Sequence, residues 1–165
     1  MPITIPKSIL LIPKVPSMAV VVLLVAEFLL MQNLHKPDPY CTLRVDYPHY
    51  STSLKETKGI DAIKLNVTSE CSAPQRFTCI TARIQKLQSN SEVTVSRFVS
   101  RIAEPISNSA NSAIFRNLFT KCEFGIVTAY KGIAEGYVIL ENGKRIEVTG
   151  SSGKYEPANC EIGAQ

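Results

Sequence analysis

The sequence predicts a mainly β domain that follows one apolar segment near the N-terminus. After Cys41, apolar and polar residues alternate with period two along several runs, and an Asn-Gly dipeptide separates two of these runs. Five cysteines behind an apolar segment indicate an oxidising compartment. We therefore expect an antiparallel β-sandwich of immunoglobulin-like size with disulfide bonds, preceded by one transmembrane helix or signal-anchor.

The apolar segment covers residues 18–34. A helix of that length spans about 25 Å, the low end for crossing a bilayer. Lys7 and Lys14 precede it, and no acidic residue occurs before Glu27. The positive-inside tendency therefore places the N-terminus in the cytoplasm. The sequence predicts four parts in this order: a cytoplasmic tail (1–17), a transmembrane helix or signal-anchor (18–34), a proline-rich stalk (35–40) and an extracytoplasmic β domain (41–165).

The same segment has the features of an anchor more than those of a cleaved signal peptide. A signal peptidase requires small residues in an A-x-A-like pattern, and the stretch "LLMQNLHKPDPYC" contains none. We expect a single-pass protein in contact with membrane lipid through residues 18–34. The alternative is a freely secreted β-sandwich binding protein that is released by cleavage at an atypical site.

Glu27 lies near the middle of the apolar segment. A carboxyl group inside a bilayer is costly, and it commonly faces a polar partner or takes up a proton. Glu27 is therefore a candidate contact with another subunit. The alternative is a span whose leucines and valines offset the cost of one acid.

Three runs predict strands of the β domain. Alternation places Ile63, Leu65 and Val67 on one face of the run "IDAIKLNVTSEC", and a second run, "CITARIQKL", repeats the pattern. The third, "GYVILENGKRIEVTG", contains Asn142-Gly143, a dipeptide that favours a type I′ hairpin turn.

The middle of the chain is ambiguous between two structures. In "VTVSRFVSRIAEPI" the apolar residues have helical spacing, which predicts a short helix ending before Pro105, but the β-branched residues equally favour a strand with a bulge. The polar stretch 107–112 predicts a loop. The run that follows, "AIFRNLFTKCEFG", predicts another strand.

The cysteine spacings fit no zinc motif, and five cysteines cannot all pair within the chain. Cys71 and Cys79 bracket a turn-rich loop, so a bridge between them would close a predicted hairpin. Cys122 and Cys160 flank the last hairpin, and a bridge there would hold the C-terminal tail to the sheet. Cys41 would then be a free thiol or form an intermolecular bond. The alternative pairs Cys41 with Cys71 or Cys79 and leaves another thiol buried.

No motif predicts catalysis, a cofactor or a metal site. His49 is the one histidine of the β domain, and a hydrolase or thiol enzyme that uses it as a base is the weakest alternative we consider. A histidine in a loop rich in proline and tyrosine is more typical of a surface residue. The net charge of +4 is spread along the chain without a basic block, which predicts no nucleic-acid partner.

Two features point to contacts or modification. Asn66 begins an N-x-T sequon on the outward face of a predicted strand, so it is a glycosylation candidate in a eukaryotic source. Tyr40, Tyr47 and Tyr50 surround His49, and such tyrosines can form a contact surface or pack into the base of the domain.

Together these features predict a non-catalytic role. We expect a binding domain, or a structural or accessory subunit of a surface or membrane assembly. The expected partner is another protein or a second copy of the chain, in contact with Glu27, Cys41 or the region from Tyr40 to Tyr50.

Overall fold

The computed structural model describes residues 22, 25, 37–89, 91–103 and 111–163. The chain divides into two compact units between Asp38 and Pro39. Of the predicted span 18–34, the described residues are Val22 and Val25, both helical and exposed, so Glu27 lies outside the described residues. Among the residues that are described, no helix is long and apolar enough to cross a bilayer.

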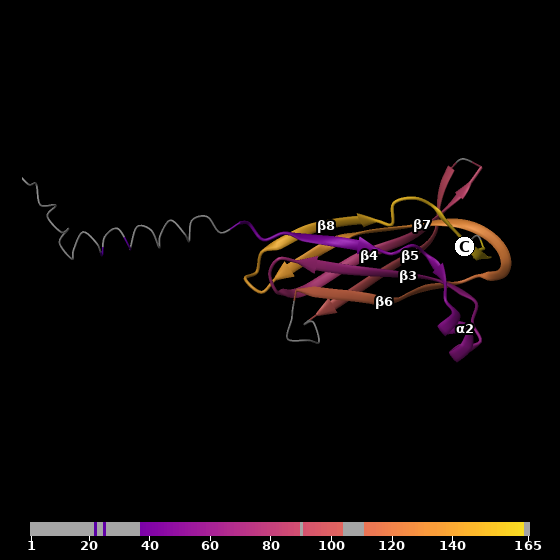
Figure 1. Ribbon diagram of the computed structural model, residues 1–165, viewed down its shortest axis with the longest axis horizontal. Helices are drawn as coiled ribbons and strands as arrows, with labels where there is room; N and C mark the ends of the chain where they lie inside the picture. The colour runs from indigo at the N-terminus through magenta and orange to yellow at the C-terminus, as the bar shows by residue number, and fades with distance from the viewer. Residues whose placement is uncertain (1–21, 23–24, 26–36, 90, 104–110, 164–165) are drawn as a thin grey trace, which may run out of the picture. The chain divides into compact units, whose positions relative to one another are not determined.

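The second unit is mainly β, as the alternation predicts, and its strands pair antiparallel in two sheets (Figure 1). In the first sheet β3 is central and pairs with the three other strands. This sheet contains β1 (Cys41–Val45), β2 (His49–Tyr50), β3 (Ala62–Cys71) and β6 (Ser112–Lys121).

The second sheet has the order β5-β4-β7-β8, and β9 also pairs with β7. Its strands are β4 (Gln75–Gln88), β5 (Ser91–Ala103), β7 (Glu123–Leu140), β8 (Arg145–Ser151) and β9 (Glu156–Glu161). Apolar side chains of both sheets meet in one buried cluster, to which Leu65 and Tyr130 contribute completely buried side chains. Burial of this cluster is the main favourable term for folding.

The ambiguous middle segment is a strand with a bulge and not a helix. In the pairing of β4 with β5, Ile84 lies opposite Ser96 and Gln85 lies opposite Thr94, so Val95 is an extra residue on β5. Val95 and Ser96 are both buried. The bulge explains why the apolar positions of this segment depart from strict alternation.

The last predicted hairpin is present, with a different turn. Gly143 has φ of +82°, whereas Asn142 does not have the positive φ that a type I′ turn needs at both central positions. Gly143 N–H donates to the Leu140 carbonyl (2.9 Å), and Leu140 N–H donates to the Lys144 carbonyl (2.9 Å). This is a three-residue loop that ends in a glycine bulge, a geometry that suits Gly143 equally well.

Sequence patterning missed one helix, α2 (Thr52–Lys58). The side chain of Ser51 caps its N-terminus by accepting from Leu54 N–H (3.4 Å), and Gly59 ends it in the left-handed region at φ +65°. None of its residues is buried, so no apolar stripe marked it.

The structure contains two disulfides. Cys122 bonds Cys160, the pairing predicted from their positions beside the last hairpin. Cys71 bonds Cys41 and not Cys79, so the predicted bridge across the β3–β4 turn is wrong, and so is the expectation that Cys41 is free or joins another chain. The alternative pairing of Cys41 with Cys71 is confirmed, and the remaining thiol is the half-buried Cys79. The reason is the register: Cys41 lies directly opposite Cys71 in the β1–β3 pair, whereas Cys79 lies well within β4, in the other sheet.

Candidate interaction surface

Exposed apolar side chains lie at two neighbouring places, the β4–β5 hairpin and the beginning of β7. We call four of them the apolar end patch: Leu87, Phe124, Ile126 and Val127. Val127 is the most exposed of them, at 70%. Val93 is also exposed, but it lies opposite Lys86 and therefore points to the other face of the hairpin from Leu87, which lies opposite Glu92. Single exposed apolar residues are normal in folded domains, but several close together are typical of a contact surface.

The patch lies at the end of the domain opposite to the beginning of β1. Cys41, the first residue of β1, pairs with the last residue of β3, whereas Lys121, just before β7, pairs with Ala62 at the beginning of β3. The ten residues of β3 therefore separate the two ends (Figure 1).

A bulge in β7 exposes part of the patch. The β7–β9 register shifts between Phe124 and Val127, so Gly125 and Ile126 have no counterpart on β9. Gly125 has φ of +101°, which glycine adopts without strain. Period-two patterning did not reveal this surface, although Gly125 inside an apolar run is a recognised sign of a bulge.

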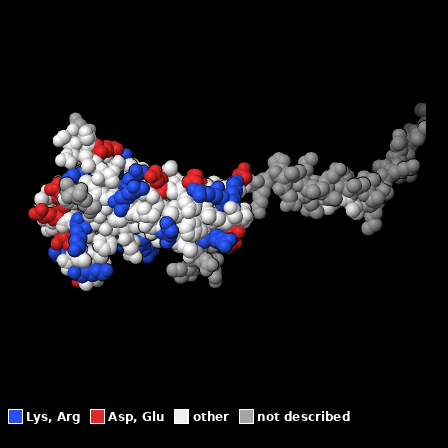
Figure 2. Space-filling model, turned by 180° about the vertical axis from the view of Figure 1, so that it is seen from behind, with Lys and Arg blue, Asp and Glu red and all other residues white. Residues whose placement is uncertain are grey.

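Acidic and basic side chains are interspersed on the face of the domain that Figure 2 shows. Several of these side chains form ion pairs at the surface. In one of them Arg83 lies 2.7 Å from Glu135. Charges of both signs that alternate in this way largely offset each other's field on that face.

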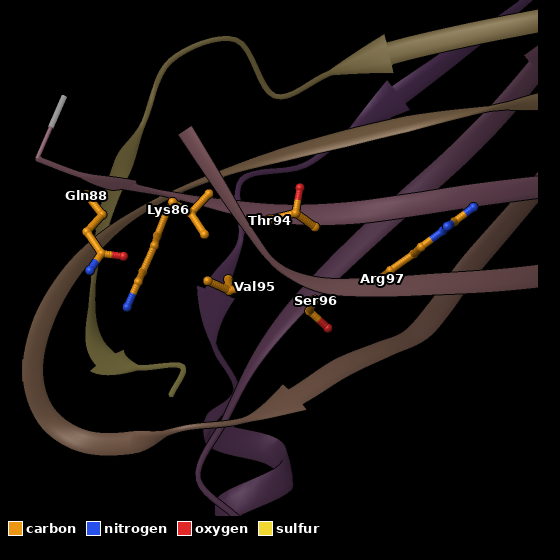
Figure 3. A pocket seen from close by; sticks show the side chains of 7 residues that line it. Lys86, Gln88, Thr94, Val95, Ser96 and Arg97 are labelled. Atoms are coloured by element: carbon orange, nitrogen blue, oxygen red, sulfur yellow. The ribbon is translucent and has the colours of Figure 1, made fainter. Parts of the chain in front are cut away.

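Two hollows adjoin the β4–β5 hairpin. One, of about 260 Å³, is lined by Leu87 and Val127 of the patch together with Lys86 and Glu161. The other, of about 290 Å³, is lined by Lys86, Gln88 and residues 93–97, next to the β5 bulge. Figure 3 shows the side chain of Arg97 pointing away from that of Lys86.

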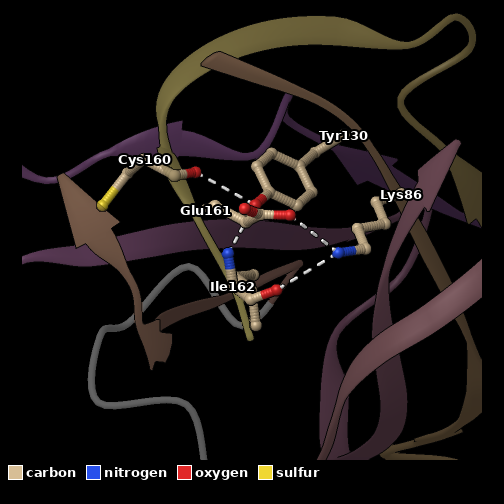
Figure 4. A network of polar contacts seen from close by, with 5 residues as sticks. All are labelled: Lys86, Tyr130, Cys160, Glu161 and Ile162. Carbon is tan, nitrogen blue, oxygen red and sulfur yellow. Dashed lines mark hydrogen bonds and ion pairs between the residues drawn. The ribbon is translucent and has the colours of Figure 1, made fainter. Parts of the chain in front are cut away.

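The ammonium group of Lys86 is already paired within the chain (Figure 4). Its Nζ lies 3.1 Å from Glu161 Oε1 and 3.5 Å from the Ile162 carbonyl oxygen. Beside it, the buried Tyr130 hydroxyl donates to the Cys160 carbonyl (3.0 Å) and accepts from Ile162 N–H (2.7 Å). Burial raises the pKa of Tyr130. This network holds the C-terminal residues in place, so we assign it a structural role.

The predicted tyrosine surface is divided between the two ends of the domain. Tyr40 is exposed beside the Cys41–Cys71 bond, where its backbone N–H donates to Ser72 Oγ (3.0 Å). Tyr50 is half-buried at the other end, and its ring lies 5.1 Å from that of Phe124. Tyr47 is exposed. Tyr50 therefore borders the apolar end patch, and Tyr40 does not.

The Tyr50 hydroxyl also donates to Asp61 Oδ1 (2.6 Å), while Lys55 of α2 donates to Asp61 Oδ2 (2.7 Å). The hydrogen bond from Lys55 lowers the pKa of Asp61 most, and the hydrogen bond from Tyr50 lowers it further. The bond between Tyr50 and Asp61 also raises the pKa of Tyr50. This cluster connects β2, α2 and the residue before β3.

His49 is exposed, and its Nδ1 lies 3.0 Å from the Tyr47 carbonyl oxygen. Within the described residues no hydrogen bond joins it to a serine or cysteine, so the hydrolase alternative gains no geometric support. In that same part of the chain, no three His, Cys, Asp or Glu side chains cluster as a metal site would require.

Asn66 is half-buried, and its Nδ2 donates a long hydrogen bond to Asp46 Oδ2 (3.4 Å). Its Oδ1 is buried without a hydrogen-bond partner. Thr68, which alternation placed on the outward face, is buried. Thr68 lies in the central strand between Arg44 and Ile114, and longer neighbours on both sides can cover so short a side chain.

Comparisons with protein-family models, curated proteins and solved structures find no match for this chain. Its function is therefore argued from its own residues.

Proposed function

We propose that this chain is a membrane-anchored protein whose extracytoplasmic β domain is a non-catalytic binding or structural subunit of a surface or membrane assembly. The observation that carries the proposal is the apolar end patch. Leu87 and Val127 are 49% and 70% exposed and line one hollow. When a partner covers exposed apolar side chains on neighbouring segments, the free energy of the system falls, and this favours binding.

Two features support the proposed location. The Cys41–Cys71 and Cys122–Cys160 bonds favour an oxidising compartment. In the sequence, the apolar residues 18–34 follow two lysines, which favours a cytoplasmic N-terminus. The predicted stalk is followed by Cys41, and the patch lies at the end of the domain opposite to this residue.

We further infer that the domain is a β-sandwich of immunoglobulin-like size. Two antiparallel sheets that share one apolar cluster support this inference, because sheets of a sandwich enclose their core in this way.

A photo-crosslinking amino acid at position 127 tests the contact surface in the native host. The matched control is the same amino acid at position 114, because Ile114 is also an exposed apolar residue, at 44%, but lies on β6. We expect defined cross-linked products from position 127 and none from position 114. Equal cross-linking from both positions, or none from position 127, would reject the patch as the contact.

Membrane fractionation with intact-mass measurement tests the anchor. A full-length chain in the membrane pool is expected, and Glu27→Leu then tests whether a carboxyl group in the segment holds a partner. A soluble product that lacks residues 1 to about 35 would instead favour the secreted binding protein.

A further inference from the structure

β5 is an edge strand with part of its backbone unpaired. In the sheet order it has β4 as its one neighbour. The buried side chain of Ser96 connects the core face of β5 to β6 of the other sheet, because Ser96 Oγ and Thr120 Oγ1 share a hydrogen bond. Beyond that point, among the described residues, no backbone hydrogen bond is made on the outer side of residues 97–103. We call these residues the β5 edge. Unpaired edges are places where another strand can add to a sheet.

The side chains of this edge have a distinct pattern. Arg97, Val99 and Arg101 alternate along the strand, and all three are exposed, Val99 at 62%. They therefore share the solvent face of the sheet. Two positive charges flank one apolar side chain.

The charge of Arg97 is not balanced by its neighbours. Arg97 lies directly opposite Arg83 on β4, and like charges in that position repel. Arg83 is paired on its other side with Glu135 (2.7 Å), but neither Arg97 nor Arg101 has an ion pair within the described part of the chain. A carboxylate supplied from outside would relieve this repulsion.

The same charges argue against a second copy as the occupant. If two β5 edges paired antiparallel around Val99, Arg97 of each copy would face Arg101 of the other. No other strand of a second copy would complement the edge either. Two carboxylates that face Arg97 and Arg101 must stand four residues apart, and no two acidic residues among positions 1–165 have that spacing.

We propose that the β5 edge binds an extended segment of a different protein, which adds to the sheet as a strand. The segment carries two carboxylates four residues apart with an apolar residue midway between them. Its backbone pairs with residues 97–103, its carboxylates face Arg97 and Arg101, and its central apolar side chain packs on Val99. Backbone hydrogen bonds supply affinity, and the two charges set register and specificity. This surface is separate from the apolar end patch, so it goes beyond the function proposed above.

A labelled nine-residue peptide, acetyl-TVETVTEVT-amide, is a suitable probe because its glutamates have the required spacing. Fluorescence anisotropy with the full chain in a non-ionic detergent should give saturable binding. The double substitution Arg97→Glu with Arg101→Glu is expected to weaken binding about tenfold or more, since it replaces attraction with repulsion at two contacts. Arg116→Glu is the matched control, because Arg116 is an exposed arginine on β6 of the other sheet, and it should leave binding unchanged.

Two N-methylated peptides separate strand addition from charge attraction. One is methylated on the backbone nitrogens at odd positions and the other at even positions. In a strand only alternate N–H groups face the neighbour, so one of the two peptides should lose binding and the other should retain it. Circular dichroism confirms that each variant remains folded.

Several results would overturn the proposal: no saturable binding, equal binding of the lysine peptide TVKTVTKVT, or equal binding of both methylated peptides. These results are distinguishable from failure of the proposed function. A lost cross-link at position 127 with intact peptide binding would reject the end patch alone.

Discussion

The Tyr130 hydroxyl donates a 3.0 Å hydrogen bond to the carbonyl oxygen of Cys160, whose side chain forms the disulfide with Cys122. One side chain of β7 thus fixes the residue that covalently holds β9. The same hydroxyl accepts from Ile162 N–H at 2.7 Å. The C-terminal strand β9 is therefore held by its backbone pairing with β7, by the Cys122–Cys160 disulfide and by the buried hydroxyl of Tyr130.

Tyr130→Phe should destabilise the domain. The ring still fills its site, but the buried N–H of Ile162 and the carbonyl of Cys160 lose their partner, which costs about 1–3 kcal/mol. Urea unfolding of the two proteins measures the difference. Tyr40→Phe is the control, because Tyr40 is 65% exposed and should change little. Equal stability of Tyr130→Phe and the unmodified chain would show that water satisfies both backbone groups.

The cysteine pairing predicts one reactive thiol. Alkylation of the unfolded, unreduced chain should modify Cys79 alone, and Cys79→Ser should abolish the label.

Breaking the Cys41–Cys71 bond with Cys41→Ser should lower the free energy of unfolding by about 2–4 kcal/mol, because the bond closes a loop in the unfolded chain. A disulfide-linked peptide that contains Cys71 and Cys79 would contradict this pairing.

Asp61 should make stability depend on pH. Hydrogen bonds from Lys55 and Tyr50 lower the pKa of Asp61 in the folded state. Its contribution is therefore complete above the pKa of the unfolded chain, about 4, and is lost as pH falls through the lower folded value. Asp61→Asn should destabilise the domain at neutral pH, and the difference from the unmodified chain should shrink below about pH 4. A difference that is constant with pH would show that the carboxylate charge contributes nothing.

Two glycines should respond to alanine for different reasons. At Gly136 a methyl group would collide with the carbonyl oxygen of Cys79 in the backbone of β4, so Gly136→Ala should separate two paired strands and unfold the domain or nearly so. At Gly143 nothing lies within 4 Å, but φ is +82°, so Gly143→Ala should cost about 1 kcal/mol of conformational strain. Gly163→Ala, in open space, is the control. Thermal unfolding ranks the stabilities of the three variants. If Gly136→Ala were as stable as Gly163→Ala, the close approach of Gly136 to the Cys79 carbonyl would be contradicted.

Local sequence patterns were sufficient to locate several of the strands. Alternation in residues 62–71 and 79–87 identified β3 and β4, and Asn142-Gly143 located the last hairpin, because side-chain period and turn residues are properties of a few neighbouring positions. The turn type was wrong because several hairpin loops accept the same glycine. Helix α2 was missed because its end signals, Ser51 and Gly59, enclose no apolar stripe.

By itself the sequence indicated the antiparallel β class and the last hairpin, and it offered the Cys122–Cys160 bond as one candidate pairing among several. The tertiary structure alone decided the partner of Cys71, the separation of Tyr40 from Tyr50, the apolar end patch and the open edge of β5. Each of these depends on register between strands distant in the chain, and a shift of one residue moves a side chain to the other face of its sheet. Period-two patterning fixes which residues face inward, but it carries no information about which strand lies beside which.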